Sequence, residues 1–542
     1  MTAALLAAAF VVLAVSCGGD GGKATRSASP TPSGSPTVQP TIVPTTEPIP
    51  GRVQDLASQS LLFTATSADG EDLASGTGSL ATGDFNGDGI GDFITGAPLA
   101  DGPDNSRKEA GEAYVIFGPL EGTLDLAEED ADVTILGASE GDNLGYSVLG
   151  GDINADGVDD IIIGAPGVTA GEDPRTDQGR AYVFFGGRSL KETVDLKEEV
   201  YDFVVTGAEG FSRVGHAMAV GDFNGDDKGD LVLGAPFAGR RPGSSPGSER
   251  TEVGEVYVVF GSGDLSGEVS IPTLEQDVTL SGSQGRPLHG QFGAAVASAD
   301  VNGDDVDDII VGAYRSNGPD GKRPASGAAY VFFGGSGLKG RLSIADNQQG
   351  VTILGKENAS LGLPIVTGDF NGDGTADVAL GARLENSGQL SALGAVHILF
   401  GGSGFKGTID LAQAAADVTI TGSQPGELVP TSMDAADLNG DGADDLIIGS
   451  PLSDAPEGRR AAGRAYIILG GSDIAGGRSL TGQQDLTVVG VGERDGLGAS
   501  VAAAEVGDDD VVYLILMAAS PVHADSAPPE PGKTYVIKPD LP

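Results

Sequence analysis

From about residue 53 onward, the chain alternates short apolar runs with polar clusters. The apolar runs are about four to eight residues long and rich in Val, Ile, Tyr and Phe, while Gly, Asp and Ser fill the intervals. Runs of this length and composition are typical of β-strands, and no spacing of about 3.6 residues persists long enough to predict a long helix. The pattern therefore predicts an all-β fold made of many short strands.

The strand pattern repeats along the chain. Its clearest element is an Asp-rich loop followed by an apolar run and Gly-Ala-Pro, first seen between Asp84 and Pro98. A degenerate seventh unit begins near Glu505. Such self-similarity is the signature of a repeat architecture. The other loops, 68 to 78 residues apart, begin at Asp152, Asp222, Asp300, Asp369 and Asp437.

Two further signatures flank each loop. Gly-x-x-Tyr and an apolar run follow each core, as in Gly111 to Tyr114, although His397 replaces Tyr in the fifth copy. A run such as Asp132-Val133-Thr134-Ile135 precedes each later loop. Each unit thus holds about four strands, and seven units predict a seven-bladed β-propeller of four-stranded blades over residues 53–542. A solenoid of stacked repeats has the same periodicity and is the alternative.

The start of the repeat region favours a closed ring. Residues 53–68 contain the run Leu61-Leu62-Phe63-Thr64, which resembles the stretch before every later loop, whereas the seventh unit ends soon after Ile537. The N-terminal strand is therefore predicted to complete the last blade. Closing the ring in this way would remove exposed strand edges.

Composition limits the possible partners. Hydrophobic residues make up 39% of the chain, which is enough for a packed core, although Trp is absent and aromatic residues are only 5%. The formal net charge is -47, so nucleic-acid phosphates and anionic membrane surfaces would repel the chain. An acidic surface either confers solubility or binds hard cations, and the spacing of the Asp residues distinguishes the two.

The Asp-rich loops have the oxygen spacing that calcium requires. Ca2+ takes about six to eight oxygen ligands at about 2.3–2.6 Å. The spacing matches the start of an EF-hand loop, but strands flank it and Thr95 stands where an EF-hand has Glu. The predicted ligands of the first loop, at positions 1, 3, 5, 7 (backbone carbonyl) and 9, are Asp84, Asn86, Asp88, Ile90 and Asp92. The equivalent sets are Asp152, Asn154, Asp156, Val158 and Asp160; Asp222, Asn224, Asp226, Lys228 and Asp230; Asp300, Asn302, Asp304, Val306 and Asp308; Asp369, Asn371, Asp373, Thr375 and Asp377; and Asp437, Asn439, Asp441, Ala443 and Asp445.

A turn held by Asx hydrogen bonds is the structural alternative for each loop. Such a turn needs one carboxylate, whereas each loop crowds three carboxylates together, so the spacing favours about six bound Ca2+ ions with a structural role. The seventh unit, around Glu505, lacks the spacing and is predicted to bind none. Asp227 and Asp305 replace the turn glycine at position 6. Because the turn requires a positive φ at this position, we expect these two loops to bind calcium more weakly than the others.

The N-terminal segment predicts export. Residues 5–15 form an apolar run shorter than the roughly 20 residues needed to span a bilayer, which suits a secretory signal. The following Leu-Ala-Val-Ser-Cys is similar to a bacterial lipoprotein signal, so residues 1–17 are predicted to be a signal peptide with lipidation at Cys17, the chain's one cysteine. Residues 18–52, rich in Gly, Ser, Thr and Pro, predict a disordered tether. No Lys or Arg precedes the apolar run, and plain secretion is the alternative.

Together these motifs resemble the FG-GAP repeats of the integrin α-chain head. Phe292-Gly293 leads into the fourth loop, which Gly312-Ala313-Tyr314 follows. The resemblance covers roughly residues 53–540 and implies a seven-bladed propeller with calcium on one face. Integrin heads usually carry fewer calcium loops, so no adhesive specificity is carried over. Gly-Ala-Pro follows the first three loops at Gly96-Ala97-Pro98, Gly164-Ala165-Pro166 and Gly234-Ala235-Pro236.

A rigid ring of loops favours a non-catalytic adhesion or ligand-binding module on a bacterial cell surface. We expect a monomeric propeller that binds a protein or glycan, touches the membrane only through a lipid at Cys17, and has no catalytic residues and no organic cofactor. The insertion at residues 238–253 carries Arg240, Arg241 and Arg250, which would meet an anionic partner or form a solvated loop.

A hydrolase built on a propeller and a scaffold subunit of a surface complex are the alternative functions. Residues 137–141 and 243–247 match Gly-x-Ser-x-Gly, but neither match lies between a strand and a helix. The four histidines are scattered along the chain. The sequence therefore favours the non-catalytic function.

Overall fold

The computed structural model describes most of the repeat region, within the unit that spans Pro48–Pro542. The predicted signal peptide, Cys17 and the tether up to residue 51 lie outside the described residues, as does most of the basic insertion. The described residues are 52–541 without 59–60, 67–78, 127–130, 170–176, 189, 208–211, 240–252, 272–276, 283–289, 319–320, 387–391, 508–510 and 520–531.

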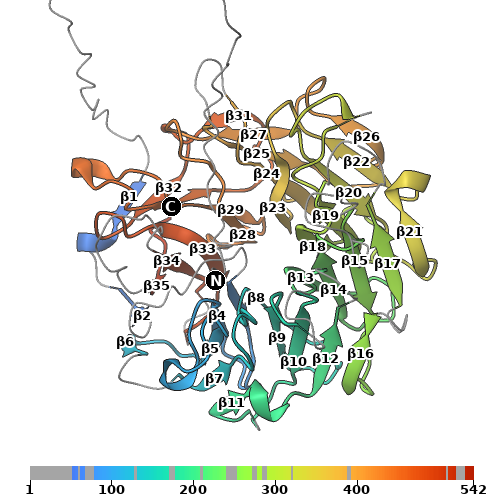
Figure 1. The fold of residues 1–542 in the computed structure, drawn as a ribbon. Helices are drawn as coiled ribbons and strands as arrows, with labels where there is room; N and C mark the ends of the chain where they lie inside the picture. The colour runs from blue at the N-terminus through green and yellow to red at the C-terminus, as the bar shows by residue number, and fades with distance from the viewer. Residues whose placement is uncertain are drawn as a thin grey trace, which may run out of the picture. The chain divides into compact units, whose positions relative to one another are not determined.

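The described chain forms seven five-stranded sheets, seen as separate blades in Figure 1. Each blade contains the four predicted strands, which pair antiparallel, and a fifth short strand that pairs parallel at the outer edge. In blades one to five the fifth strand comes from the next unit along the chain, whereas in the sixth and seventh blades it comes from the N-terminal part, as β1 (Arg52–Asp55) and β6 (Gly122–Asp125). Most of its residues are exposed or half-buried, so it lacks the apolar pattern of the other four.

The strands are given from the innermost to the outermost. The first blade holds β3 (Leu80–Gly83), β4 (Asp92–Ala97), β5 (Glu112–Ile116), β7 (Val133–Leu136) and β11 (Thr193–Asp195). The second holds β8 (Ser147–Gly151), β9 (Asp160–Ala165), β10 (Arg180–Phe184), β12 (Phe203–Thr206) and β16 (Gly267–Ser270). The third holds β13 (Ala217–Gly221), β14 (Asp230–Ala235), β15 (Glu255–Val259), β17 (Val278–Ser281) and β21 (Gly340–Ser343).

The remaining blades follow the same order. The fourth holds β18 (Ala295–Ala299), β19 (Asp308–Gly312), β20 (Ala328–Phe332), β22 (Val351–Leu354) and β26 (Gly407–Asp410). The fifth holds β23 (Leu361–Gly368), β24 (Asp377–Ala382), β25 (Ala395–Leu399), β27 (Val418–Thr421) and β31 (Gly476–Ser479). The sixth holds β28 (Ser432–Ala436), β29 (Asp445–Ser450), β30 (Arg464–Ile468), β32 (Leu486–Val489) and β1 (Arg52–Asp55). The seventh holds β33 (Leu497–Ala504), β34 (Tyr513–Ala518), β35 (Lys533–Ile537), β2 (Phe63–Thr66) and β6 (Gly122–Asp125).

The described helices are all short 3-10 turns. In the part of the chain that the structure describes, no helix is long and apolar enough to cross a membrane. The turns are η1 (Leu56–Ser58), η2 (Pro103–Asn105), η3 (Leu196–Glu198), η6 (Ile344–Asp346) and η7 (Pro456–Gly458).

The blades form a closed ring. The innermost strand of each blade contacts the innermost strand of the next, and β33 of the seventh blade contacts β3 of the first. Strand β2 pairs antiparallel with β35, with Phe63 opposite Val536, so the N-terminal strand completes the last blade. Strand β1 pairs parallel with β32 at the edge of the sixth blade. The propeller and its predicted closure are therefore confirmed, and the solenoid is wrong.

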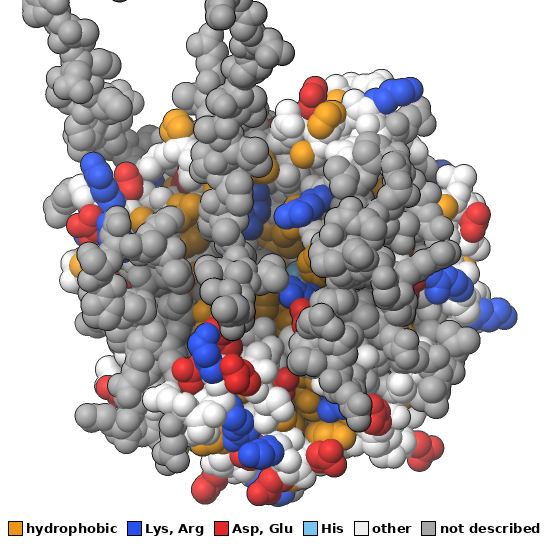
Figure 2. All heavy atoms as spheres, viewed as in Figure 1, with side chains coloured by type: hydrophobic (Ala, Val, Ile, Leu, Met, Phe, Trp, Pro, Cys, Tyr) orange, Lys and Arg blue, Asp and Glu red, His pale blue; other side chains and the backbone are white. Residues whose placement is uncertain are grey.

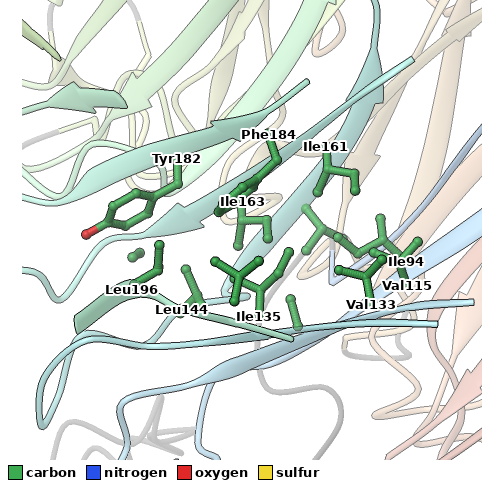
Figure 3. Packing of buried hydrophobic residues seen from close by; sticks show 14 of the residues in the cluster. Ile94, Val115, Val133, Ile135, Leu144, Ile161, Ile163, Tyr182, Phe184 and Leu196 are labelled. Carbon is green, nitrogen blue, oxygen red and sulfur yellow. The ribbon is translucent and has the colours of Figure 1, made fainter. Parts of the chain in front are cut away.

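The core lies between the faces of neighbouring blades. In Figure 3, Ile94 and Val115 of the first blade pack near Ile161 and Ile163 of the second. Because each blade packs against a neighbour on both faces, all six residues of β4 and of β9 are buried. This two-sided burial explains why the second strand of each unit is a continuous apolar run rather than an alternating one.

Arginine side chains hold several of the outer strands in place. Arg107 of the first blade donates both guanidinium nitrogens to the carboxylate of Asp195 in β11, at 2.7 Å each. Arg323 makes the same bidentate contact with Asp410 in β26. These pairs are partly buried, and their paired geometry fixes the direction of the guanidinium. The fifth strand is thus fastened by charge rather than by an apolar face.

Ring closure predicts unequal effects at the two N-terminal strands. Phe63 of β2 is 5% exposed and its ring centroid lies 6.2 Å from that of Phe93, whereas Val53 of β1 is 44% exposed. We expect Phe63→Ala to lower the free energy of unfolding by about 3–5 kcal/mol through the cavity it leaves. Val53→Ala is the matched control and should cost well under about 1 kcal/mol. Urea denaturation at fixed calcium measures both, and equal effects would contradict closure through β2.

Candidate functional site

The six Asp-rich loops lie at equivalent places in six blades. Each connects the innermost strand to the second strand, as between β3 and β4. Because the blades share one strand order, the loops lie together on one face of the ring. In five of them an apolar side chain at position 2 is buried below the loop, and in the sixth Leu438 is half-buried. The buried residues are Phe85, Ile153, Phe223, Val301 and Phe370.

The carboxylate at position 1 organises the backbone of each loop. Asp84 accepts hydrogen bonds from the amides of Gly87 and Asp88 through Oδ1, at 2.8 and 3.1 Å, and from Gly89 through Oδ2 at 2.9 Å. Asp222 and Asp437 repeat this pattern in the third and sixth loops. The loop therefore curls around its first carboxylate, as the Asx-turn alternative requires.

The carboxylate at position 9 begins the second strand and is the most buried group of the loop. Asp92 has 0% exposure; its Oδ2 accepts the Phe85 amide at 2.9 Å and its Oδ1 accepts the Gly118 amide at 2.8 Å. It therefore joins the loop to the turn that follows the third strand. In the fifth loop the donor within the loop is the amide of Asn371 at position 3 rather than that of position 2. Equivalent hydrogen bonds are accepted by Asp160, Asp230, Asp308, Asp377 and Asp445.

Burial disfavours the charged form of these aspartates. It raises the pKa of Asp92 to about 7, against the lowering effect of its amide partners, and the nearby Asp88 carboxylate raises it further. The pKa of Asp230 rises to about 6 for the same reason, with Asp222 and Asp226 adding to the effect. Because opposite charge favours ionised carboxylates, a cation in the loop would oppose all of these shifts. The pKa rises to about 7 at Asp160, Asp308, Asp377 and Asp445 as well.

The asparagine at position 3 faces the buried carboxylate. Asn302 Nδ2 lies 3.1 Å from both oxygens of Asp308, and Asn224 lies 3.2 Å from both oxygens of Asp230. In the first loop, Asn86 Oδ1 is buried and has no hydrogen-bond partner. An acceptor oxygen left in this way costs free energy unless a donor or a cation satisfies it.

The chemistry of these donors fits a hard divalent cation. Each loop offers three carboxylates, one amide oxygen and one backbone carbonyl, which are the oxygen ligands calcium takes. The structure does not bring them into a finished ligand cage: within the described residues, no three Asp, Glu, His or Cys side chains converge closely enough to hold a metal. The carboxylates at positions 1 and 9 instead accept hydrogen bonds from backbone amides.

Neighbouring loops are joined in pairs. Asp159, at position 8 of the second loop, accepts the Asp84 amide of the first loop through Oδ2 at 2.9 Å. Asp307 and Asp444 make the same contact to the third and fifth loops. Position 8 of the first loop is Gly91, where an added Cβ would lie 2.4 Å from the carbonyl oxygen of Glu505, so a side chain is excluded there.

Two loops differ from the others in local detail. Asp227 and Asp305 replace the glycine at position 6 and have φ of 62° and 66°, as predicted. In the third loop the ammonium group of Lys228 lies 2.8 Å from a carboxylate oxygen of Asp226, a predicted ligand. This exposed ion pair places a positive charge beside one carboxylate of the third loop and in no other described loop.

Four residues that the sequence analysis did not select line the middle of the ring at the opposite end of the strands. Tyr146 and His216 directly precede the innermost strands β8 and β13. Tyr314 lies two residues after β19, the second strand of the fourth blade, and Arg383 directly follows β24, the second strand of the fifth. We call these four the channel-mouth cluster. Departures from the repeat would have pointed to it, since Tyr314 and Arg383 stand where four other units have Pro.

Other residues noted in the sequence have structural partners. His397 is 1% exposed, and its Nε2 lies 2.8 Å from Glu385, which Lys356 also contacts. Ser139, in the first Gly-x-Ser-x-Gly match, donates its amide to Asp142. His397 therefore fills a tyrosine position within the fifth blade.

Comparison with known proteins agrees with this fold. The FG-GAP repeat model matches six segments of the chain, which therefore contains six FG-GAP repeats, and its β-propeller resembles that of integrin α chains. Each segment contains one Asp-rich loop. The matched residues are 76–116, 144–184, 214–259, 292–332, 365–399 and 429–468.

Curated relatives match part of the chain. Phosphatidylinositol-glycan-specific phospholipase D of Bos taurus is 32% identical over 245 residues, covering 44% of this chain and 27% of the relative. Integrin alpha pat-2 of Caenorhabditis elegans is 32% identical over 250 residues, covering 44% and 18%. The match thus spans only a minor part of each relative. The solved V. cholerae biofilm matrix protein Bap1 aligns over 89% of this chain at 12% identity, with a TM-score of 0.34 that is too low to establish a shared fold.

The pairing of loops predicts a cost for losing an aspartate that lies outside the proposed ligand sets. We expect Asp159→Ala to destabilise the protein by about 1–3 kcal/mol, because the Asp84 amide would lose its partner. Asp264→Ala, at an exposed loop position, is the control and should have little effect. Unfolding is measured in EDTA so that bound ions do not contribute. Indistinguishable variants would show that the contact between the loops adds no stability.

Proposed function

We propose that the protein is a calcium-binding propeller that acts outside the cell as a non-catalytic adhesion or ligand-binding module. The observation that carries the calcium part is the repeated loop, in which a fully buried position-9 carboxylate lies within the field of the other loop carboxylates. Such a cluster is costly in a chain of net charge -47 unless a cation neutralises it.

The proposed ions act on structure. Extracellular calcium modules bind at roughly 0.1–1 mM, so each site would add about 0.4–1.4 kcal/mol at millimolar calcium. Six such ions would stiffen one face of the ring. The ligands in this proposal are those given above for each loop, from Asp84 in the first to Asp445 in the sixth, and the seventh unit binds none.

Ligand binding is supported by architecture and by similarity. A closed ring holds many loops in fixed relative positions, which suits recognition of a protein or glycan. The similarity to integrin α chains supports the same function in a general sense. The N-terminal sequence supports placing the propeller at a bacterial surface, tethered through residues 18–52 and a lipid on Cys17, or secreted.

A hydrolase remains the second candidate, favoured by one observation. The Bos taurus relative is named a phosphatidylinositol-glycan-specific phospholipase D, although this chain matches only 27% of it. A scaffold subunit of a surface complex is the third. Release of phosphate or alcohol from a phosphodiester by the pure protein would favour the hydrolase over the binding module.

Calcium binding is tested on the full chain by titration calorimetry and thermal unfolding. We expect about six ions to bind and the melting temperature to rise with calcium, because the ions bind only the folded loops. Asp373→Ala removes a position-5 ligand that is exposed and should lower the stoichiometry by one. Asp346→Ala, exposed in η6, is the control and should leave it unchanged. No binding heat, together with identical melting in calcium and in EDTA, would overturn the calcium proposal.

Ligand binding is tested on arrays of glycans and matrix proteins. We expect selective binding at millimolar calcium that falls at least tenfold in EDTA, since the ions rigidify the loops of the ring. Magnesium at equal ionic strength controls for screening. Equal retention on all surfaces, or none on any, would favour the scaffold instead.

A further inference from the structure

The channel-mouth cluster joins aromatic and basic side chains from four consecutive blades. The ring centroids of Tyr146 and His216 are 5.0 Å apart, and the Tyr146 hydroxyl lies 3.3 Å from His216 Nε2. His216 also meets Phe237 edge-on at 6.3 Å. The Arg213 guanidinium lies 5.2 Å from the centroid of the Phe237 ring and is paired with Asp177. The second and third blades therefore contribute an aromatic wall with a hydroxyl.

The other side of the mouth carries arginine. Tyr314 and Arg383 are both half-buried. Burial raises the pKa of Tyr146 and lowers the pKa of Arg383, and the Tyr314 phenol has a smaller, raising effect on both pKa values. The exposed Arg315 guanidinium lies 5.4 Å from the centroid of the Tyr314 ring. Figure 2 shows Lys or Arg side chains beside hydrophobic atoms around the middle of the face in view.

Arg383 has no carboxylate partner among the described residues. Several half-buried arginines do have one, as in the pairs Arg107–Asp195 and Arg323–Asp410, whereas Arg180 contacts only a tyrosine hydroxyl. The nearest acid in sequence, Glu385, is held by His397 and Lys356. In a chain with 78 acidic and 31 basic side chains, a guanidinium placed at the channel without an acid is available to an external anion.

The repeat shows that this chemistry is local to one side of the ring. The position of Tyr146 and His216 is filled in the next four blades by small or apolar residues or by Thr. The position of Tyr314 and Arg383 is filled by Pro in other units. Only blades two to five therefore build the cluster, so the fold does not require it. The replacing residues are Ala294, Leu363, Thr431 and Ala499 at the first position and Pro98, Pro166, Pro236 and Pro451 at the second.

We propose that the channel-mouth cluster binds an acidic saccharide, with its carboxylate on Arg383 and its ring against Tyr146 and Tyr314. This inference rests on the proposed ligand-binding function and names its ligand class. A guanidinium offers paired donors that match a carboxylate. The phenol hydroxyls donate to and accept from sugar hydroxyls, and the aromatic rings offer apolar surface to the sugar ring.

Charge favours a short saccharide or the end of a longer one. The net charge of -47 repels an extended polyanion that lies across the ring. One carboxylate at the mouth is repelled only by acidic groups within about one Debye length, roughly 8 Å in physiological salt. An acidic peptide offers the same carboxylate but no polyhydroxylated ring for the tyrosines, so it is the weaker fit.

The experiment measures binding of trigalacturonate to the full chain by titration calorimetry in millimolar calcium. We expect binding that Arg383→Gln weakens at least tenfold, equal to about 1.4 kcal/mol. Tyr314→Phe should weaken it several-fold by removing one hydroxyl. Arg188→Gln, an exposed arginine outside the cluster, is the matched control and should stay within twofold. Unchanged calcium stoichiometry and melting show that each variant is folded.

Three results would overturn the proposal. One is no trigalacturonate binding by a protein that still binds calcium and its array ligand, which would leave the proposed function standing. Another is equal binding by the Arg383→Gln and Arg188→Gln variants. The third is tighter binding of hexaglutamate than of trigalacturonate, which would assign the site to acidic peptides. Loss of calcium binding in the unmodified protein would count against the proposed function instead.

Discussion

The structure depends on one buried carboxylate that each of six blades places at the start of its second strand. Asp92 and its equivalents are fully buried, and each accepts one amide from its own loop and one from the glycine after the third strand. The group therefore fixes three strands of a blade at one point. Its burial also creates the electrostatic demand that a cation would meet, because the amides offset only part of the desolvation. Fold and proposed calcium binding thus have the same cause.

The ring adds a second constraint, because every blade must pack on two neighbours. Side chains such as Ile94 and Ile163 meet across the blade faces, and Asp159, Asp307 and Asp444 join loops in pairs. A ring of this kind has no free end, so β2 must supply the strand that the seventh unit lacks. Closure gives every unit a neighbour on both sides, in contrast to a solenoid, whose two terminal repeats each have a neighbour on one side only.

Function in such a repeat is expected where units differ. The Asp-rich loops, where we propose that calcium binds, are common to six units, whereas the channel-mouth cluster occurs in four blades only. Lys228 in the third loop and His397 in the fifth blade are also departures, but each has a partner in its own unit that explains it. Arg383 has no such partner among the described residues. Our two proposals follow from this difference: ions bind the face that six units share, and the ligand binds the face where the units differ.

The sequence by itself determined the seven units, their four strands, the N-terminal closing strand and the positive φ of Asp227 and Asp305. These features follow from local composition and from the spacing of apolar residues, and both recur in successive units of the chain. Only the tertiary structure decided the fifth strand of each blade and the pairing of loops through Asp159. It also decided the contact between Tyr146 and His216 in the channel-mouth cluster. Such contacts join residues that are remote in sequence and mostly exposed or polar, so they leave no apolar period. Their partners are set by how the blades close around the channel.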